Sequence, residues 1–221
     1  LVRALQRRWW SWCTRIIACS DFLRRIPIER YGVPESKLQL IFNAYHGPTS
    51  AELRETRAEV RKALGLKPEP RYLLTICRLM IWKGVDGILQ ALKELPSDVE
   101  LLVAGDGDMF VGWQELAREM GLEQRAHFLG NVPYARIPSL IRAADVFVLN
   151  SEYEGLSHTL LEVSALGLPT VCTGVCGNPE VIEDGVNGLL VPPKRPDALR
   201  AAIARVLDDA PLRERFAAAG L

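Results

Sequence analysis

The sequence predicts an α/β fold built on a doubly wound parallel sheet. From Arg71 onward, short apolar runs alternate with amphipathic stretches, and the apolar runs are nearly continuous. Continuous apolar strands are buried on both faces, which is typical of a parallel sheet covered by helices on both sides. A hydrophobic fraction of 48% in 221 residues is enough to fill such a core.

Six strands and six helices are predicted in alternation after Arg71. The strands are expected at residues 72–77, 99–104, 126–129, 145–149, 170–173 and 188–191. The helices are expected at residues 84–94, 112–120, 134–142, 157–166, 179–183 and 197–207. Ligands of such sheets bind outside the carboxyl ends of the strands, so the loops that follow the strands are the first place to look for a site.

The first part of the chain predicts one βαβ unit. A helix to about Thr14 precedes a strand at 15–20, a helix at 21–31 that Pro27 interrupts, and a strand at 37–42. Two parallel strands cannot cover both of their faces. We therefore expect the unit to be the last piece of a larger sheet whose earlier strands precede Leu1.

A linker separates this unit from the regular part of the chain. Residues 43–49 form a turn-rich connection, and a charged amphipathic helix is expected at 50–64, with Ser50 as its candidate N-cap. The segment 65–70, rich in proline and glycine, ends this helix.

Composition excludes several classes of protein. Lys plus Arg and Asp plus Glu balance at 27 each, so no global field attracts nucleic acid, and we expect no nucleic-acid partner. The five cysteines form no CxxC pair, which favours reduced thiols and a cytoplasmic location. No apolar run is long enough for a membrane span or a signal peptide.

The first thirty residues combine arginines with tryptophans. Seven arginines stand against Asp21 and Glu29, and Trp9, Trp10 and Trp12 lie among them. This pattern fits peripheral contact with an anionic membrane surface, and it equally fits a packed amphipathic helix. Both interpretations remain open from the sequence.

The most informative motif places two carboxylates eight residues apart across a loop-to-helix junction. Glu154 follows the strand at 145–149, and Glu162 lies on the helix that begins near Ser157. One carboxylate can bind a sugar hydroxyl and the other a ribose diol, with a phosphate at the helix start between them. The alternative is a pair of surface glutamates beside a core helix.

Two cations follow the first strand of the same sheet. Arg78 and Lys83 stand directly after residues 72–77, at the edge where the Glu154 loop is expected. An arginine fork and a lysine ammonium can neutralise a diphosphate leaving group as a glycosidic bond breaks. Alone they would be read as solvated loop residues, but the shared sheet edge favours a site.

Three loops rich in small residues follow other strands. Gly105-Asp106-Gly107 fails as a dinucleotide fingerprint, because Phe110 occupies the place of its third glycine. It is either a turn that lets a nucleotide approach the backbone or a plain tight turn. The other loops are Gly130-Asn131-Val132-Pro133, where a base can lie against amide groups, and Gly174 to Glu180, with Pro179 suited to a first helical turn.

Taken together, these residues resemble a known family. Arg78 with Lys83, the Gly105 turn, Glu154 with Glu162, and Gly177-Asn178-Pro179-Glu180 are similar in order and spacing to the retaining glycosyltransferases of family 4, also called glycosyl transferases group 1. The resemblance implies the GT-B arrangement of two facing Rossmann-like domains. It matches residues 1–46 to the terminal βαβ unit of the N-terminal domain, 47–70 to the interdomain linker and helix, 71–210 to the nucleotide-sugar donor domain, and 211–221 to the start of a C-terminal tail.

The resemblance also implies site roles. Glu154, Arg78 and Lys83 would be catalytic: the two cations bind the donor diphosphate, and Glu154 contacts the sugar near its 3- and 4-hydroxyls. Glu162 would hold the ribose. The further substrate-binding residues implied are Gly155, Leu156, Ser157, His158 and Thr159 for sugar and phosphate, Asn131 and Val132 near the base, and Gly105, Asp106 and Gly107. No cofactor and no metal are expected, because Arg, Lys and a helix dipole would neutralise the phosphates.

The implied function is transfer of a sugar from a UDP- or GDP-sugar to a glycan or lipid-linked acceptor with retention of configuration. Polysaccharide, lipopolysaccharide or glycolipid synthesis is the expected setting, in the cytoplasm or peripherally at the inner face of the membrane, with the missing N-terminal domain as a partner. A sugar-nucleotide epimerase is the second hypothesis, which requires a further acid–base pair. A non-catalytic nucleotide-sugar-binding fragment is the third.

Overall fold

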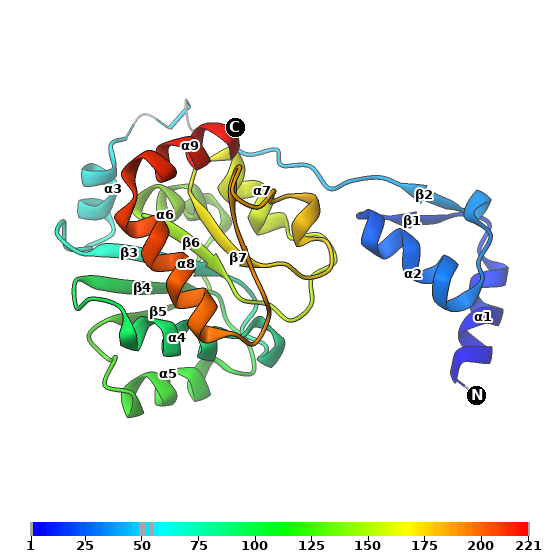
Figure 1. Cartoon of the computed structure of the whole chain (residues 1–221), viewed down its shortest axis with the longest axis horizontal. Helices are drawn as coiled ribbons and strands as arrows, with labels where there is room; N and C mark the ends of the chain where they lie inside the picture. Colours follow the sequence, from blue (N-terminus) through cyan, green and yellow to red (C-terminus); the bar gives the residue numbers. More distant parts are fainter. Residues whose placement is uncertain (1, 49–51, 54, 221) are drawn as a thin grey trace.

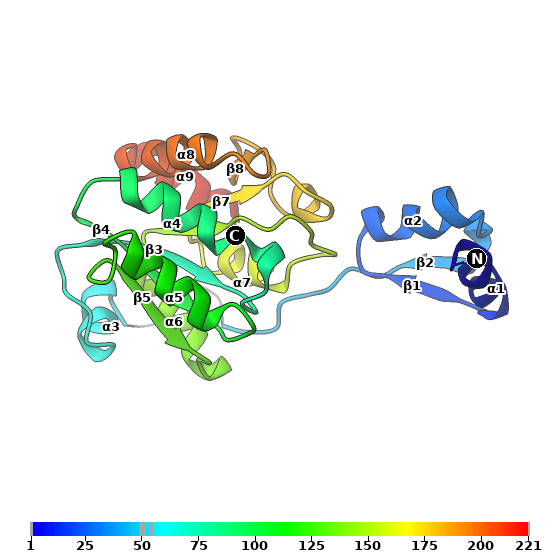
Figure 2. The same ribbon diagram turned by 90° about the horizontal axis from the view of Figure 1, so that it is seen from below.

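The chain is described by a computed structural model that places residues 2–48, 52–53 and 55–220. These residues form a two-stranded parallel sheet and a six-stranded parallel sheet with helices around each. The larger sheet confirms the predicted doubly wound α/β fold. Figures 1 and 2 show the smaller sheet and its helices beside the larger body, joined to it by an extended segment that runs through residues 41–46.

The smaller unit is the predicted βαβ unit preceded by a helix. Its strands pair in parallel register from Ile16 opposite Leu38 to Ala18 opposite Leu40. Both strands are shorter than predicted, and a 3-10 turn at Glu35–Lys37 replaces the start of the second. The elements are α1 (Val2–Trp12), β1 (Ile16–Ala18), α2 (Asp21–Tyr31) and β2 (Leu38–Leu40).

The predicted interruption at Pro27 is wrong, because α2 continues through this residue. Proline removes one N–H donor and crowds the preceding turn, which costs about 3 kcal/mol in a helix interior. Pro27 is buried here, so packing of its ring offsets part of that cost. The helix ends four residues later at Tyr31, and its C-cap is Gly32, whose φ of 67° is the left-handed conformation that glycine adopts freely.

The helix predicted at 50–64 is shorter in the structure. Helix α3 spans Arg57–Ala63, and its N-cap is Thr56, whose side chain accepts a hydrogen bond from the backbone of Glu59 while the Glu59 carboxylate accepts from Thr56. This reciprocal capping box fixes the start of the helix. The N-cap predicted at Ser50 lies outside the described residues.

The larger sheet has the strand order β5-β4-β3-β6-β7-β8, and every pair is parallel. The chain first builds outward from β3 to one side and then returns to build from β6 to the other. The topological switch point therefore lies between β3 and β6. The strands are β3 (Arg71–Ile76), β4 (Val99–Ala104), β5 (Ala126–Gly130), β6 (Val146–Leu149), β7 (Thr170–Thr173) and β8 (Gly188–Val191).

Helices cover both faces of this sheet, and each face has its own apolar cluster. Helices α4, α5, α8 and α9 bury Leu73, Val103 and Val148 on one face, while α6 and α7 bury Leu74, Leu102 and Phe147 on the other. Every residue of β4, β6 and β7 is buried, as the continuous apolar runs predicted. The helices are α4 (Val85–Glu94), α5 (Phe110–Glu119), α6 (Ile137–Ala143), α7 (His158–Ala165), α8 (Pro196–Asp208) and α9 (Ala210–Gly220).

Two predicted helices differ in the structure. Residues 134–142 divide into a 3-10 turn at Tyr134–Arg136 and α6, because Pro138 fits only the first turn of an α-helix. The helix predicted at 179–183 is only a 3-10 turn, Asn178–Glu180. The Asn187 side chain accepts from the backbone of Glu183 and thereby holds a loop where the helix was expected.

Two further features concern membrane spans and the cysteines. Among the described residues, no helix combines the length and the apolar character that a membrane crossing needs. All five cysteines are free thiols. Burial raises the pKa of Cys77 to about 11 and that of Cys172 to about 12, so both remain protonated at neutral pH.

Candidate functional site

Two loops meet at the switch point of the larger sheet. One loop follows β3 and carries Lys83, and the other follows β6 and carries Glu154. Asn150 at the end of β6 donates a hydrogen bond from Nδ2 to the Gly84 carbonyl at 2.8 Å. A Cβ on Gly84 would lie 2.4 Å from the Asn150 backbone oxygen, so only glycine permits this approach. The two loops are therefore held in direct contact.

Lys83 and Glu154 form an ion pair across this contact. The Lys83 Nζ lies 2.5 Å from Glu154 Oε1, and the side chains are only 17% and 11% exposed. Ser151 donates a hydrogen bond from Oγ to the same oxygen at 2.7 Å. Within the part of the chain that the structure describes, no hydrogen bond engages Glu154 Oε2. One oxygen thus anchors the carboxylate, and the other can accept a ligand hydroxyl.

A cavity of about 450 Å³ lies at the carboxyl edge of the sheet, lined by residues at the ends of β3 and β4 and just after β5. The exposed Arg78 lines it, and among the described residues its guanidinium forms no ion pair or hydrogen bond. A cation without a protein partner is available for an anionic ligand. The predicted residues that line the cavity are Arg78, Gly105, Asp106, Asn131, Val132 and Thr159.

The glycines of the 105–107 turn face a neighbouring loop. A Cβ on Gly105 would lie 1.9 Å from the Cys77 carbonyl oxygen, and one on Gly107 would lie 2.5 Å from that of Leu79. Their φ angles are 130° and 155°. Both glycines are thus required for the turn to pack against the loop that carries Arg78, whether or not a nucleotide also approaches the turn.

Helix α7 begins four residues after Glu154, and Thr159 in its first turn lines the cavity. Ser157 is its N-cap, and its side chain accepts a hydrogen bond from the Leu160 amide at 3.3 Å. The amides of His158 and Thr159 have no acceptor among the described residues, as expected for the first turn of a helix. These amides can bind an anion. His158 itself is exposed, Gly155 is partly buried, and Leu156 is buried in the loop before the helix.

Glu162 occupies a separate, less polar place on α7. It lines a narrow space with Tyr45 from the linker and Tyr134 from the turn after β5. Burial raises the pKa of Glu162, while interaction with the Tyr134 hydroxyl and the charge of His158 partly offset this rise. Burial and the Glu162 charge raise the pKa of Tyr134 in turn. The two tyrosines therefore frame this carboxylate.

The structure thus arranges the predicted site residues in three adjoining groups. Lys83 pairs with Glu154, Arg78 and Thr159 share the cavity with Asn131 and Val132, and Glu162 lies among tyrosines. Arg78 and Thr159 line the cavity, and they lie on the same two chain segments as Lys83 and Glu154, five residues from each, so the first two groups adjoin. The direct pairing of Lys83 with Glu154 was not predicted.

Sequence reasoning also missed three residues that position the site: Ser151, Asn150 and Tyr134. Ser151 and Asn150 precede Glu154 on the same loop, and a polar residue directly after a buried strand was the available signal. Tyr134 gave no signal, because its approach to Glu162 depends on how α6 packs against α7.

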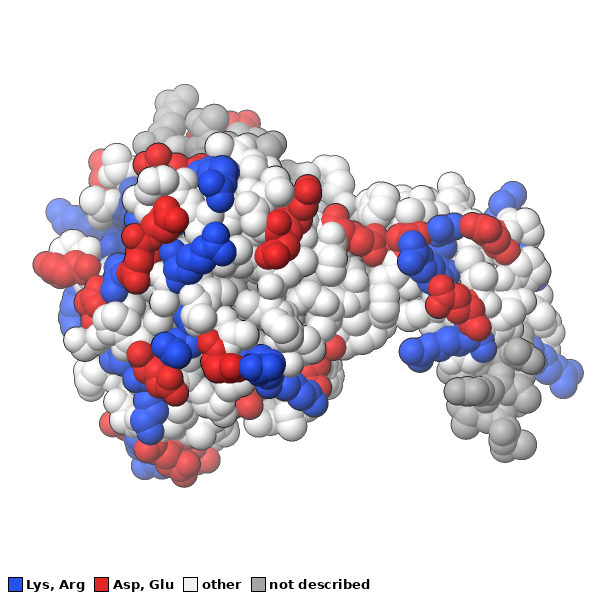
Figure 3. All heavy atoms as spheres, in the orientation of Figure 1, with Lys and Arg blue, Asp and Glu red and all other residues white. Residues whose placement is uncertain are grey.

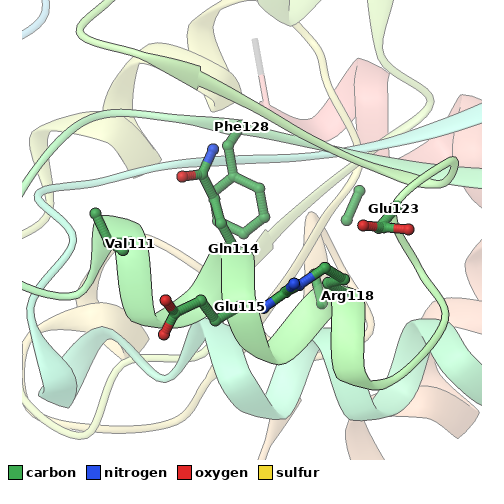
Figure 4. A pocket seen from close by; sticks show the side chains of 8 residues that line it. Val111, Gln114, Glu115, Arg118, Glu123 and Phe128 are labelled. Carbon is green, nitrogen blue, oxygen red and sulfur yellow. The ribbon is translucent and has the colours of Figure 1, made fainter.

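A second cavity of about 430 Å³ lies away from the site, between α5 and β5 (Figure 4). Its mixed lining includes Val111, Glu115, Arg118 and Phe128. The described residues contain no group of three or more His, Cys, Asp or Glu arranged to hold a metal ion. On the face seen in Figure 3, acidic and basic side chains are interspersed.

The fold and the site together define a class of protein. A doubly wound sheet with cations, carboxylates and a helix N-terminus at its switch point is an arrangement for binding a nucleotide or a related phosphorylated ligand. A family model described as glycosyl transferases group 1 matches residues 56–221. The chain belongs to this family.

Curated relatives support the same assignment. The chain is 36% identical over 170 residues to alpha-D-kanosaminyltransferase of Streptomyces kanamyceticus, which covers 76% of this chain and 44% of that protein. It is 30% identical over 205 residues to an uncharacterized glycosyltransferase of Methanocaldococcus jannaschii, covering 90% of this chain and 52% of the relative. The chain spans about half the length of these relatives.

Solved structures agree in fold. HepE of Anabaena, in complex with UDP and glucose, superposes with a TM-score of 0.83 at 25% identity, covering 94% of this chain and 57% of HepE. WaaG, a glycosyltransferase involved in lipopolysaccharide biosynthesis, gives a TM-score of 0.85 at 23% identity, covering 93% of this chain and 57% of WaaG. The six-stranded parallel sheet therefore matches structures of the GT-B type.

Proposed function

We propose that this chain is the donor-binding part of a retaining glycosyltransferase of family 4 that uses a nucleotide-sugar. The Lys83–Glu154 pair at the switch point is the observation that carries the proposal. It places a cation for a leaving phosphate next to a carboxylate for a sugar hydroxyl. The complexes of HepE with UDP and with UDP-glucose support a UDP-sugar as the donor.

We propose a task for each group of the site. Arg78 and Lys83 neutralise the donor diphosphate, and the first-turn amides of α7 add partial positive charge. Glu154 accepts hydrogen bonds from the sugar through Oε2, and Glu162 accepts them from the ribose. Asn131 and Val132 contact the base in the cavity after β5. This set of charges neutralises the phosphates with protein groups, so we include no metal and no cofactor.

The proposed acceptor is a glycan or a lipid-linked glycan in polysaccharide, lipopolysaccharide or glycolipid synthesis. It would bind to an N-terminal domain whose final βαβ unit is residues 1–46, with 47–70 as linker, 71–210 as donor domain and 211–221 as the start of a tail. We place the protein in the cytoplasm, with peripheral contact at the inner face of the membrane as the alternative. Trp9 and Trp12 are 70% and 69% exposed on α1, and Arg8 lies over the Trp12 ring, which supports a surface contact.

Calorimetric titration of the 221-residue chain with UDP, GDP, UDP-glucose and GDP-mannose tests the donor. We expect micromolar to millimolar affinity for one nucleotide series, because the loop cations and the base cavity are both present. Arg78→Ala should weaken that binding, and the matched variant Arg118→Ala, on α5 outside the site, should leave it unchanged. Absence of binding to all four ligands would remove the proposal. Retention of configuration is tested by NMR of the product anomer once an acceptor is found.

A further inference from the structure

The Gly177–Glu180 turn was singled out in the sequence but has no task in the donor site. In the structure it contacts helix α2 of the smaller unit. The Glu180 carboxylate accepts a hydrogen bond from the Asp21 amide at 2.7 Å through Oε2, and one from the Phe22 amide at 2.9 Å through Oε1. We call these two hydrogen bonds the α2–Glu180 contact.

This contact completes the N-terminus of α2. The first amides of a helix have no partner inside the helix, so they need external acceptors. Ser20 provides one for the Leu23 amide at 3.1 Å through its own Oγ. Glu180 provides the acceptors for the Asp21 and Phe22 amides, although it lies 159 and 158 residues away from them in the sequence. A carboxylate at this position also interacts favourably with the helix dipole.

Two side chains extend the contact onto the Glu154 loop. The Phe22 ring meets the Tyr153 ring edge to face, with centroids 6.3 Å apart. The Leu23 Cδ1 lies 3.0 Å from where a Cβ on Gly155 would be. Helix α2 thus touches the residues immediately before and after Glu154. In Figures 1 and 2 the N-terminal end of α2 points toward the larger body.

The turn that carries Glu180 is itself fixed to the Glu154 loop. The Gly177 amide donates to the Glu154 carbonyl at 3.3 Å, and a Cβ on Gly177 would lie 2.0 Å from the Gly155 carbonyl oxygen. Asn178 is fully buried and donates from Nδ2 to the Thr173 carbonyl. Helix α2 is therefore linked, through Glu180 and the turn that carries it, to the backbone of Glu154.

The geometry points to Glu180 as a positioning residue that holds the N-terminal unit, through the first turn of α2, against the Glu154 loop of the donor site. The inference rests on the proposed function for the role of Glu154 as a sugar contact, whereas the α2–Glu180 contact itself is independent of that function. A transferase must place its acceptor within reach of the sugar carbon, so a fixed distance between the two units matters to transfer. Glu180 fixes that distance at the sugar end of the site and leaves the diphosphate loop at Arg78 untouched.

Amide hydrogen exchange in the 221-residue chain, resolved by residue with NMR, tests the contact. In Glu180→Ala we expect the Asp21 and Phe22 amides to exchange about fivefold faster or more, since each loses a charge-assisted hydrogen bond. The Leu23 amide is the internal reference, because Ser20 still caps it. Glu183→Ala, an exposed glutamate three residues further on, is the matched control and should change neither amide.

Titration with UDP and UDP-glucose measures ligand affinity, which tests the positioning role separately from the local stability of α2. Glu180→Ala should change the affinity for UDP by no more than about twofold. It should lower the ratio of UDP-glucose affinity to UDP affinity by about threefold or more, because only the Glu154 loop is loosened. Unchanged exchange at Asp21 and Phe22 in a folded Glu180→Ala chain overturns the contact. Equal loss of UDP and UDP-glucose affinity overturns the positioning role. If the unaltered chain binds neither ligand, the proposed function fails and the exchange data alone decide the contact.

Discussion

Replacement of Lys83 by methionine should destabilise the chain and weaken donor binding by separate routes. The change removes the cation 2.5 Å from Glu154 Oε1 but keeps the length of the side chain. Exposed ion pairs contribute at most about 1 kcal/mol, and loss of one partner from a buried pair costs about 3–5 kcal/mol. With exposures of 17% and 11%, this pair lies between those limits, and we expect the free energy of unfolding to fall by about 2 kcal/mol.

A double-mutant cycle separates the ion pair from other effects. Urea unfolding, followed by circular dichroism, is measured for Lys83→Met, Glu154→Gln and the double variant, with the exposed Lys93→Met as control. The double variant should recover about 1–2 kcal/mol relative to the sum of the single variants, because no unpaired charge remains. It should not recover affinity for UDP, which falls about 30-fold if the lost cation contributes about 2 kcal/mol to diphosphate binding. A coupling below about 0.5 kcal/mol, or restored UDP affinity, would refute the reasoning.

Three further predictions follow from the same geometry. Gly177→Ala should lower stability in urea by about 3 kcal/mol, because its Cβ would lie 2.0 Å from the Gly155 oxygen. Gly112→Ala, inside helix α5, should instead raise stability by about 0.5–1 kcal/mol, because alanine is the better helix former; an equal loss of stability in both variants would contradict this. UDP affinity should decrease as the pH falls, because burial raises the pKa of Glu162 above its ordinary value of 4.5 and only the ionised carboxylate accepts hydrogen bonds from two ribose hydroxyls. In titrations between about pH 5 and 8, Glu162→Gln should abolish this pH dependence. Cys172 should resist iodoacetamide at about pH 8 until urea is added, because its pKa is about 12. Modification of the folded chain as fast as that of the urea-unfolded chain would contradict this prediction.

Sequence reasoning located most strands because their signal is local. A run such as Asp145 to Leu149 must be buried on both faces, and no other segment of the chain is needed to recognise it. Helix limits were less accurate, because they depend on capping contacts. The start of α3 follows from the reciprocal bonds of Thr56 and Glu59, and the 178–180 turn from the hydrogen bonds of Asn178 and Asn187.

The sequence by itself determined which chemical groups stand at the ends of the strands. Lys83 follows one strand and Glu154 another, so the sequence predicts that both lie at one sheet edge. The tertiary structure decided which groups touch. The register that pairs β3 with β6 brings Lys83 and Glu154 together across 71 residues, and the approach of α2 joins Asp21 to Glu180. Strand order and the packing of separate units depend on contacts between distant segments, and local periodicity carries no information about those contacts.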